Sequence, residues 1–265
     1  MKVMAWNCRG LACAPTIRTL RALIRTNRPD VLFLSKTIVV SSCYWSSLFR
    51  MGFSYWLQVL PIGCRGGLFV TWKQGFSLEP ICLDQNQIFC RMVSDPSPCS
   101  WLISCIYAPH SPQDRNSFWP TLTSVGSSFE GPWFLLGDFN AILSSVDKKG
   151  GRSFGSPFHF DFVDFVHSNA LVDLGFVGNK FTWSNHRPGK NNIKERLDRG
   201  LANQDWVHLY PNSLINHLLA ANLDHCPILL STVGSYRNIP KPFHFEAFWT
   251  QDHSSYGVVA GAWLA

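Results

Sequence analysis

Residues 132–140 read Pro-Trp-Phe-Leu-Leu-Gly-Asp-Phe-Asn, a short apolar run that ends in a glycine and two polar side chains. The apolar part, Trp133–Leu136, is bounded by proline and glycine, which is typical of a strand buried on both faces of a sheet. Gly137 allows a sharp exit of the backbone from that strand. Alternation along an extended chain points Asp138 and Asn140 the same way. A carboxylate and a carboxamide placed there can hold a metal ion, orient a water molecule or bind a phosphate oxygen, although Gly-Asp-x-Asn is also ordinary turn chemistry.

The bulk composition is that of a folded, soluble protein with a sizeable core. Of the 265 residues, 46% are hydrophobic and 15% are charged, which excludes a disordered chain. The formal net charge of +6 fits an anionic partner without requiring one. Six basic residues precede the first acid, Asp30, and these are Lys2, Arg9, Arg18, Arg21, Arg25 and Arg28. This row is more simply a solvated face than a phosphate-facing one.

The cysteines and the apolar runs indicate an intracellular protein that does not enter a membrane. The nine cysteines form no C-x-x-C pair, so neither a zinc ribbon nor a thioredoxin-type site is indicated. Their odd number and apolar surroundings are typical of free thiols in a reducing compartment. Asn7 and Arg9 interrupt any signal-peptide core, and no apolar run approaches the roughly 20 residues of a membrane span.

The first 35 residues predict a strand, a helix and a second strand. Lys2–Asn7 and Asp30–Ser35 are the strand-like runs. Between them Ile17, Leu20 and Ile24 recur at helical spacing, and a proline ends the helix. The strand–helix–strand order predicts a parallel, right-handed connection.

The rest of the chain is richer in strands than in helices. Further strands are predicted at Tyr55–Leu60, Gly67–Trp72, Gly75–Leu83, Ile88–Val93, Trp101–Tyr107, Trp133–Leu136, the pair Phe181–Trp183 and Ile193–Asp198, Ser213–Leu219, and Cys226–Leu230. Helices are predicted within Asp114–Val125, from Ser156-Pro157 onward, and after Asn203 as an N-cap. About ten strands interleaved with few helices predict two packed sheets with outer helices, an α/β or α+β fold that is not all-parallel. After Val233 the composition becomes linker-like.

Several polar residues lie where predicted strands end, and all are of types useful for hydrolysing a phosphodiester. They are Asn7, Tyr107, Asp138, Asn140, Asp198, Asp224 and His225. Each also has a plain structural explanation. Asn7 can form a turn, Tyr107 can be a core ring with an exposed hydroxyl, and Asp198 can be a surface ion-pair partner.

Taken together, these residues and their neighbours resemble the endonuclease/exonuclease/phosphatase superfamily, from Met1 to about Thr232. The motifs that carry the resemblance are Trp6-Asn7-Cys8-Arg9-Gly10-Leu11, Tyr107-Ala108-Pro109, Gly137-Asp138-Phe139-Asn140, Phe181-Thr182-Trp183-Ser184-Asn185, Ile193–Arg199 and Asp224-His225-Cys226-Pro227. More narrowly, the chain resembles the endonuclease domain of plant LINE-type (non-LTR) retrotransposons. Asp147–Gly151 and Leu201–Trp206 support that narrower resemblance.

The resemblance implies a four-layer sandwich of two mixed β-sheets with outer helices, and Mg²⁺- or Mn²⁺-dependent cleavage of a phosphodiester in DNA. In that family's pattern His225 contacts the scissile phosphate and Asp198 orients its imidazole. Asp138 aligns or deprotonates the attacking water, and Asn140 holds the phosphate beside it. Tyr107 donates a hydrogen bond to a phosphate oxygen.

The remaining implied roles concern metal and substrate. Asn7 and Asp224 help to bind the metal ion. The substrate-binding residues are Asn7, Tyr107, Asn140, Thr182 and Trp183. The resemblance further implies a domain at 1–233, a linker and tail at 234–265 toward an absent reverse transcriptase, and a nuclear, monomeric protein that binds DNA and no membrane.

One position departs from the family pattern. Lys36 stands where family members carry the glutamate that is the main metal ligand, and an ammonium has no lone pair to offer a cation. At about 4 Å from a divalent ion it would be repelled by roughly 8 kcal/mol at an effective dielectric of 20. Leu223, where serine is usual, is a minor departure. We therefore expect weakened metal affinity and impaired turnover. The alternatives are an inactive nucleic-acid or protein interaction module in which Lys36 contacts phosphate, and a lipid-headgroup phosphatase that no membrane-directed feature supports.

Overall fold

The computed structural model describes residues 1–234 with gaps at 40–44, 64–65, 94–99, 152–159 and 220–222. The chain divides into two compact units, Met1–Ser235 and Tyr236–Ala265, and the described residues belong to the first. The predicted linker and tail therefore lie outside the described residues, apart from Gly234.

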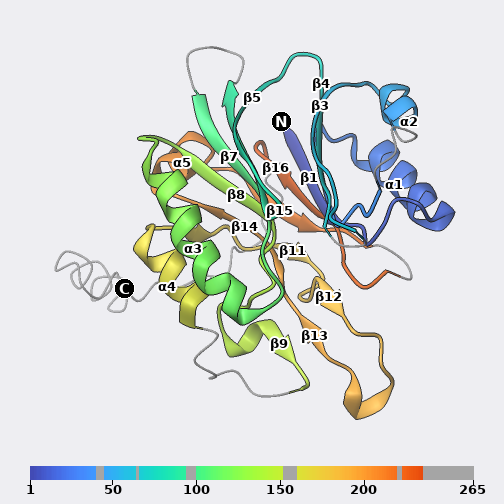
Figure 1. Cartoon of the computed structure of the whole chain (residues 1–265), viewed down its shortest axis with the longest axis vertical. Coiled ribbons are helices and arrows are strands. Elements are labelled where there is room, and N and C mark those ends of the chain that lie inside the picture. The colour runs from blue at the N-terminus through green and yellow to red at the C-terminus, as the bar shows by residue number, and fades with distance from the viewer. Residues whose placement is uncertain (40–44, 64–65, 94–99, 152–159, 220–222, 235–265) are drawn as a thin grey trace, which may run out of the picture. The chain divides into compact units, whose positions relative to one another are not determined.

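Two mixed sheets form the centre of the first unit (Figure 1). The seven-stranded sheet has the order β11 (Val177–Gly178), β15 (Leu214–His217), β16 (Ile228–Ser231), β1 (Lys2–Asn7), β2 (Val31–Ser35), β4 (Leu68–Lys73), β3 (Phe53–Val59). The six-stranded sheet has the order β10 (Val172–Asp173), β14 (Asp198–Ala202), β8 (Trp133–Asp138), β7 (Ser100–Tyr107), β6 (Gln87–Val93), β5 (Ser77–Leu83). A small third sheet joins β12 (Trp183–Ser184), β13 (Lys194–Glu195) and β9 (Lys148–Lys149). β1 and β2 are parallel, as predicted, and so are β7 and β8.

Helices cover the outer face of each large sheet. α1 (Ala14–Asn27) and α2 (Trp45–Phe49) lie beside the seven-stranded sheet, and α3 (Pro112–Ser127) and α4 (Phe160–Ser168) lie side by side over the six-stranded one (Figure 1). A shorter helix, α5 (Gln204–Leu209), is capped by the Asn203 side chain, which accepts from Trp206 N as expected. The predicted four-layer α/β sandwich of two packed mixed sheets is confirmed.

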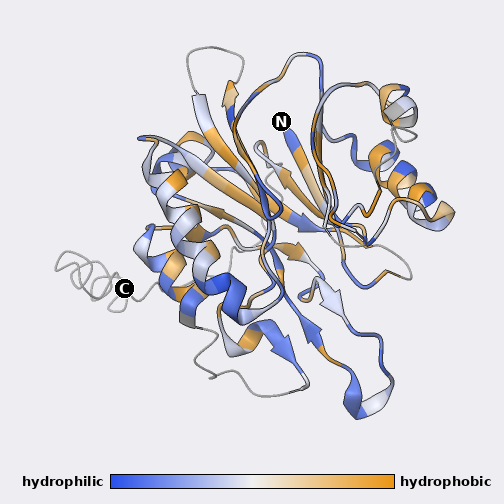
Figure 2. Cartoon of the chain, in the orientation of Figure 1, coloured by the Kyte–Doolittle hydropathy of each residue, from blue (hydrophilic) through white to orange (hydrophobic). Residues whose placement is uncertain are grey.

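Alternation along the strands explains why both sheets are buried on two faces. In β1, Val3 and Ala5 pack between the sheets, whereas Met4 and Trp6 pack under α1. A strand of this kind reads as a continuous apolar run, and these strands are the hydrophobic ones in Figure 2. The β12–β13 arm is hydrophilic in the same view.

One predicted strand was wrong in a way that matters for the site. Ile193–Asp198 is not a single strand, because Lys194–Glu195 pairs in the small sheet while Asp198 begins β14 in the six-stranded sheet. The segment Asp198-Arg199-Gly200-Leu201-Ala202 lacks the β-branched pattern of a strand. Gly200 is required by packing, since a Cβ there would lie 2.7 Å from Ile215 Cδ1 of the other sheet.

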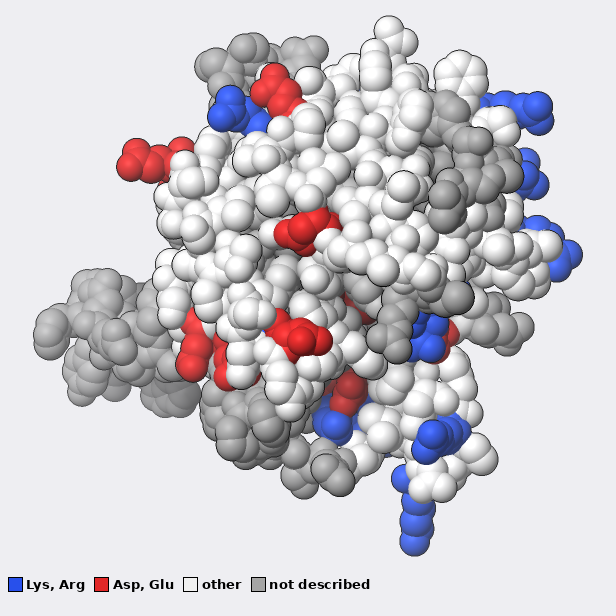
Figure 3. Space-filling model, viewed as in Figure 1, with Lys and Arg blue, Asp and Glu red and all other residues white. Residues whose placement is uncertain are grey.

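Other element boundaries differ less. β15 and β16 are shorter than the predicted Ser213–Leu219 and Cys226–Leu230, and the short α2 was not predicted. The predicted helix start at Ser156-Pro157 lies outside the described residues. Among the described helices, none has the length and apolar character needed to cross a bilayer. In Figure 3 the Lys and Arg side chains gather along the edge formed by α1 and α2 and on the β12–β13 arm.

Candidate active site

The stretch around Gly137 brings Asp138 to the rim of the six-stranded sheet. β8 continues through Gly137 to Asp138, so the strand ends two residues later than the predicted Leu136. Gly137 has a φ of 138°, and a Cβ on it would lie 2.1 Å from the Ile106 carbonyl oxygen of β7. Glycine is therefore needed for close approach of two strands. Asp138 itself is 1% exposed, and its Oδ1 accepts from Asn140 N at 2.9 Å.

Asp198 lies directly opposite Asp138 in the antiparallel β8–β14 pair. Two like charges in a direct cross-strand pair repel each other, so a group between them must stabilise the arrangement. Thr182 helps to hold Asp198 in place, because its hydroxyl accepts from the backbone N–H groups of Leu197 and Asp198 at 3.0 Å each. Thr182 is fully buried, and the structure places it as a support for Asp198.

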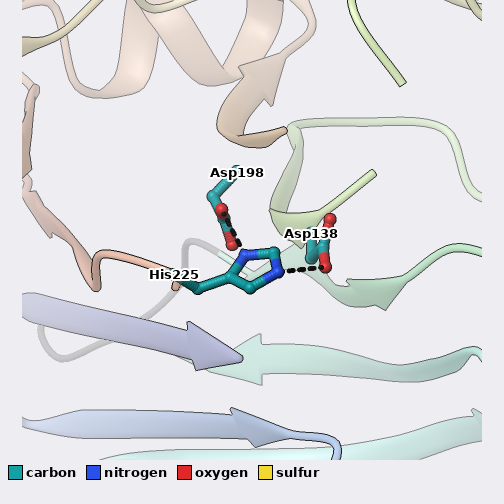
Figure 4. Close-up of side chains that lie close together, drawn as sticks. All are labelled: Asp138, Asp198 and His225. Carbon is teal, nitrogen blue, oxygen red and sulfur yellow. Dashed lines mark hydrogen bonds and ion pairs between the residues drawn. The ribbon is translucent and has the colours of Figure 1, made fainter. Parts of the chain in front are cut away.

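The group between the two carboxylates is the imidazole of His225 (Figure 4). Its Nδ1 lies 3.0 Å from Asp198 Oδ2, and its Nε2 lies 3.8 Å from Asp138 Oδ2. The backbone around it is fixed by a bridge to Trp183 and by Trp6 Nε1, which donates to the His225 carbonyl at 3.2 Å. The hydrogen bond to Asp198 assigns the proton to Nδ1, so Nε2 faces Asp138 and the cleft.

The electrostatics of this buried trio follow from its geometry. Burial lowers the pKa of His225, but the carboxylates of Asp198 and Asp138 outweigh that effect and raise the pKa above its ordinary value. Burial raises the pKa of Asp198 to about 6, against the opposing effect of the imidazole. The two carboxylates therefore favour the protonated form of the imidazole, so His225 can carry a positive charge.

Asn7, at the end of β1, completes the cluster from the other sheet. Its Nδ2 donates to Asp138 Oδ2 at 2.8 Å and lies 3.3 Å from His225 Nε2. Its Oδ1 is buried and has no hydrogen-bond partner. A buried carbonyl oxygen without a partner costs stability unless a ligand satisfies it, and a hard cation is a suitable ligand.

Two sets of residues offer metal ligands here. Asp138, Asp198 and His225 have ligand atoms within 4.8 Å of one another and could hold a metal ion. Those atoms already bond to each other or to Asn7, so a cation would have to break these bonds. Asn7 Oδ1 and Asp224 form the alternative set. The unpartnered oxygen of Asn7 favours this second set, in which a cation would have to displace only the 2.7 Å contact of Arg9 with Asp224 Oδ2.

Lys36 and Arg9 bring positive charge to the same place. Arg9 NH1 forms an ion pair with Asp224 Oδ2 at 2.7 Å, a pairing that the sequence did not predict. Lys36, with a backbone φ of 54°, follows β2. Burial lowers its pKa, as does the charge of Arg9, while Asp224 and Asp138 raise it. The ammonium of Lys36 thus lies within electrostatic reach of the carboxylates of Asp224 and Asp138.

The remaining predicted residues line the same rim. Tyr107 is partly exposed, and burial together with the Asp138 charge raises its pKa to about 12, so its hydroxyl stays a donor. Asn140 has a φ of 47°, and its Nδ2 donates to the Ala108 carbonyl at 2.7 Å. Its Oδ1 lies 3.0 Å from Nδ1 of His110, a rim residue that sequence analysis missed. Trp183 is partly exposed beside His225.

A second buried charge cluster supports the site from behind. Arg199 donates to Asp147 at 2.6 Å and to Asp173 at 2.7 Å, and Arg196 donates to Asp173 at 2.6 Å. These four residues tie β14 to β10 and to the segment before β9. They were missed because the partners are far apart in the sequence, and nothing local in the sequence pairs them.

No protein-family model matches this chain, and no curated protein matches it. Solved structures match well. A 3'-5' exonuclease (NExo) from Neisseria meningitidis is 18% identical, with a TM-score of 0.65 over 87% of this chain and 99% of that chain. The AP endonuclease LMAP from Leishmania major is 16% identical, with a TM-score of 0.68 over 86% of each chain.

A third similar structure is the endonuclease domain of TRAS1, a telomere-specific non-LTR retrotransposon. It is 14% identical, with a TM-score of 0.66 over 86% of this chain and 96% of that domain. These three proteins are members of the endonuclease/exonuclease/phosphatase superfamily. At such low identities the likeness establishes a shared fold, and the chain has the two-sheet sandwich of that superfamily.

Proposed function

We propose that this chain is a DNA endonuclease of the divalent-metal-dependent phosphodiester hydrolase type, and that Lys36 slows its turnover. The observation that carries the proposal is His225 held between two buried carboxylates, with Nδ1 3.0 Å from Asp198 and Nε2 beside Asn7. Buried carboxylates and an unsatisfied carbonyl destabilise a fold, so their presence together at one rim is best explained by a catalytic role.

In this proposal each side chain has one task. His225, positioned by Asp198, contacts a non-bridging oxygen of the scissile phosphate through Nε2. Asp138 takes a proton from the attacking water, whose oxygen bonds to phosphorus as the bond to the leaving oxygen breaks and that oxygen is protonated from solvent. Tyr107 and Asn140 donate to phosphate oxygens and stabilise the charge that develops there.

A divalent ion, Mg²⁺ or Mn²⁺, would be held by Asn7 Oδ1 and the Asp224 carboxylate. When bound, it supplies positive charge that stabilises the transition state and the leaving oxygen. The Arg9–Asp224 ion pair and the ammonium of Lys36 occupy the same charged surroundings, which is why we infer weak metal affinity.

A nucleic-acid substrate is supported by the charge beside the site. The loop between β12 and β13 begins directly after Trp183-Ser184, and exposed cations gather on this arm (Figure 3). They are Arg187 and Lys190, with Lys180 before the arm and Lys194 on its return. Cations of this kind bind the phosphate backbone without regard to base sequence. A similar structure, a variant of the 3' phosphatase NExo from Neisseria, is described as bound to a product DNA hairpin.

The narrower origin also belongs to this proposal. We infer that the chain derives from a plant LINE-type element, acts as a monomer in the nucleus, and precedes a reverse transcriptase region in the ancestral polyprotein. The motif Gly137-Asp138-Phe139-Asn140 and the likeness to the TRAS1 domain support it.

A second candidate is an inactive nucleic-acid binding module with the same fold. The Arg9–Asp224 pair, at 2.7 Å, favours it because this contact satisfies a predicted metal ligand without metal. Lys36 then contacts a phosphate oxygen.

Nicking of supercoiled plasmid separates the two candidates. Lys36→Glu restores a carboxylate beside Asn7, so we expect at least tenfold faster nicking in Mg²⁺, abolished by chelator and by His225→Ala. The matched control is Arg18→Glu, the same charge change on an exposed position of α1. If Lys36→Glu binds plasmid but nicks no faster than Arg18→Glu, the hydrolase proposal fails and the binding module stands.

A further inference from the structure

A groove at the far end of α1 is lined by cations from three separate elements. Its volume is about 710 Å³. The lining residues are Arg21, Ile24, Arg25, Arg28, Arg50, Met51 and Lys73. Five of these seven carry positive charge and none carries a carboxylate. The groove lies on the edge formed by α1 and α2, where Lys and Arg gather in Figure 3.

The groove is separate from the candidate active site. Lys73 N donates to the Asp30 carbonyl, and Asp30 N donates to the Lys2 carbonyl, so the groove lies where β1 begins. Asn7 lies where β1 ends, five residues further on, which is about 16 Å along an extended strand. A single side chain cannot take part in both places.

Local structural needs explain only part of this charge. Arg25 and Arg28 lie at the C-terminal end of α1, where a cation interacts favourably with the helix dipole. Lys73 lies 4.0 Å from the Asp30 carboxylate, whose other oxygen accepts from Lys2 N. Neither the helix dipole nor the Asp30 carboxylate explains the charge of Arg50, which follows α2 and is exposed.

The arrangement is also unfavourable without a ligand. Arg21 and Arg25 are four residues apart on α1, so these like charges are neighbours on one helix face, and Arg28, the C-cap just beyond the helix, lines the same groove. Within the part of the chain that the structure describes, Arg25, Arg28 and Arg50 form no ion pair with a carboxylate. An anion with several charges in a row would neutralise all of them at once.

We propose that this groove binds the phosphate backbone of nucleic acid at a second site, remote from the cleft. Guanidinium groups present planar pairs of N–H donors that match the oxygens of a phosphate, and four of the five cations are arginines. Ile24 and Met51 supply an apolar floor against which a sugar or base can pack. The proposal does not depend on hydrolysis at His225, because the groove binds phosphate whether or not the cleft cleaves it.

The test compares two double variants that each lose two positive charges. Arg25→Gln with Arg50→Gln removes two groove cations. Arg18→Gln with Arg91→Gln is the control, since Arg18 lies on α1 outside the groove lining and Arg91 is exposed, with a 4.0 Å pair to Glu79 and a 5.9 Å contact over the Phe129 ring. All four positions are exposed, so both variants should fold, and equal melting temperatures check this.

Binding of a fluorescein-labelled single-stranded oligonucleotide is measured by anisotropy in EDTA over a range of salt concentrations. Each lost phosphate contact lowers the salt slope by about 0.7, so the groove variant should bind more weakly with a slope shallower by about 1.4, while the control keeps the wild-type slope. Equal changes in both variants would overturn the proposal. The proposal would also be overturned if the groove variant bound the oligonucleotide as the wild type does but no longer sedimented with phosphatidylserine vesicles. That result would assign the groove to a membrane surface.

The same experiment separates this proposal from the hydrolase proposal. If Lys36→Glu never nicks plasmid but only the groove variant loses slope, the groove stands and the hydrolase proposal fails. If Lys36→Glu nicks and the groove variant matches its control, the hydrolase proposal stands and the groove is refuted.

Discussion

Replacing Asp198 with asparagine tests whether that carboxylate sets the protonation of His225. The variant removes one of the two negative charges that flank the imidazole, but it keeps an oxygen that can accept from Nδ1 at the present 3.0 Å. The ring therefore stays in place while the nearer charge disappears. Asp138, at 3.8 Å from Nε2, still contributes its charge from the other side.

The size of the effect follows from the contact that is lost. A hydrogen bond to a charged group stabilises by about 1.5–3 kcal/mol, and one pKa unit corresponds to about 1.4 kcal/mol. The pKa of His225 should therefore fall in Asp198→Asn, because the charge that raises it most is removed. Asp138→Asn should lower it by less, because Asp198 raises the pKa of His225 more than Asp138 does.

The assay is an NMR titration of the histidine ring resonances. The chain has nine histidines, and His225 is identified by the resonance that His225→Gln lacks. An unchanged pKa in Asp198→Asn, or a larger fall in Asp138→Asn, would refute the argument that Asp198 is the partner that orients and charges the imidazole.

Two further predictions concern stability. Arg199→Met removes one partner, at 2.6 Å and 2.7 Å, from the buried carboxylates of Asp147 and Asp173 and leaves them only Arg196 to share, so urea unfolding should show a loss of about 3–5 kcal/mol. Arg91→Met, at an exposed pair, should cost at most about 1 kcal/mol, and equal losses would contradict the account. Burial lowers the pKa of His217 to about 4, so the ring is neutral in the folded protein at neutral pH. In the unfolded chain the ring has a pKa of about 6.5, so the free energy of unfolding is at its full value above that pH and falls as the pH drops toward 4. Between pH 7 and pH 5 the wild type should lose about 2 kcal/mol through this group, and His217→Gln should lose that much less; identical pH dependence in both would show that His217 does not titrate as described.

The parts of the fold that could be predicted from sequence were those specified locally. Lys2–Asn7 and Trp133–Leu136 are apolar on both faces because both faces are buried, and such runs are unmistakable in a sequence. The Asn203 cap was predicted for the same reason, since its hydrogen bond to Trp206 spans three residues. Because Asn7 and Asp138 sit at the ends of such strands, their place at the sheet rim followed directly.

The parts that could not be predicted depend on partners far away in the chain. β14 begins at Asp198 because it pairs with β8 and because Gly200 permits the close approach of Ile215, and neither reason is visible within residues 194–202. The Arg9–Asp224 ion pair joins residues that are 215 positions apart in the sequence. The same holds for Arg199, whose partners come from two other segments.

The composition of the cleft favours hydrolysis with one altered position over binding alone. A surface that only binds phosphate needs cations and hydrogen-bond donors near solvent. Lys36, Arg9 and the β12–β13 arm already supply them. It gains nothing from the negative charges of Asp138 and Asp198, which are 1% and 2% exposed and repel an anionic ligand. Both carboxylates flank the imidazole of His225 and favour its positive charge, and an imidazole positioned in that way is useful for catalysis. Lys36, like Arg9, thus places a positive charge beside these carboxylates, and in the proposed mechanism a carboxylate at position 36 would supply a further oxygen ligand for a cation.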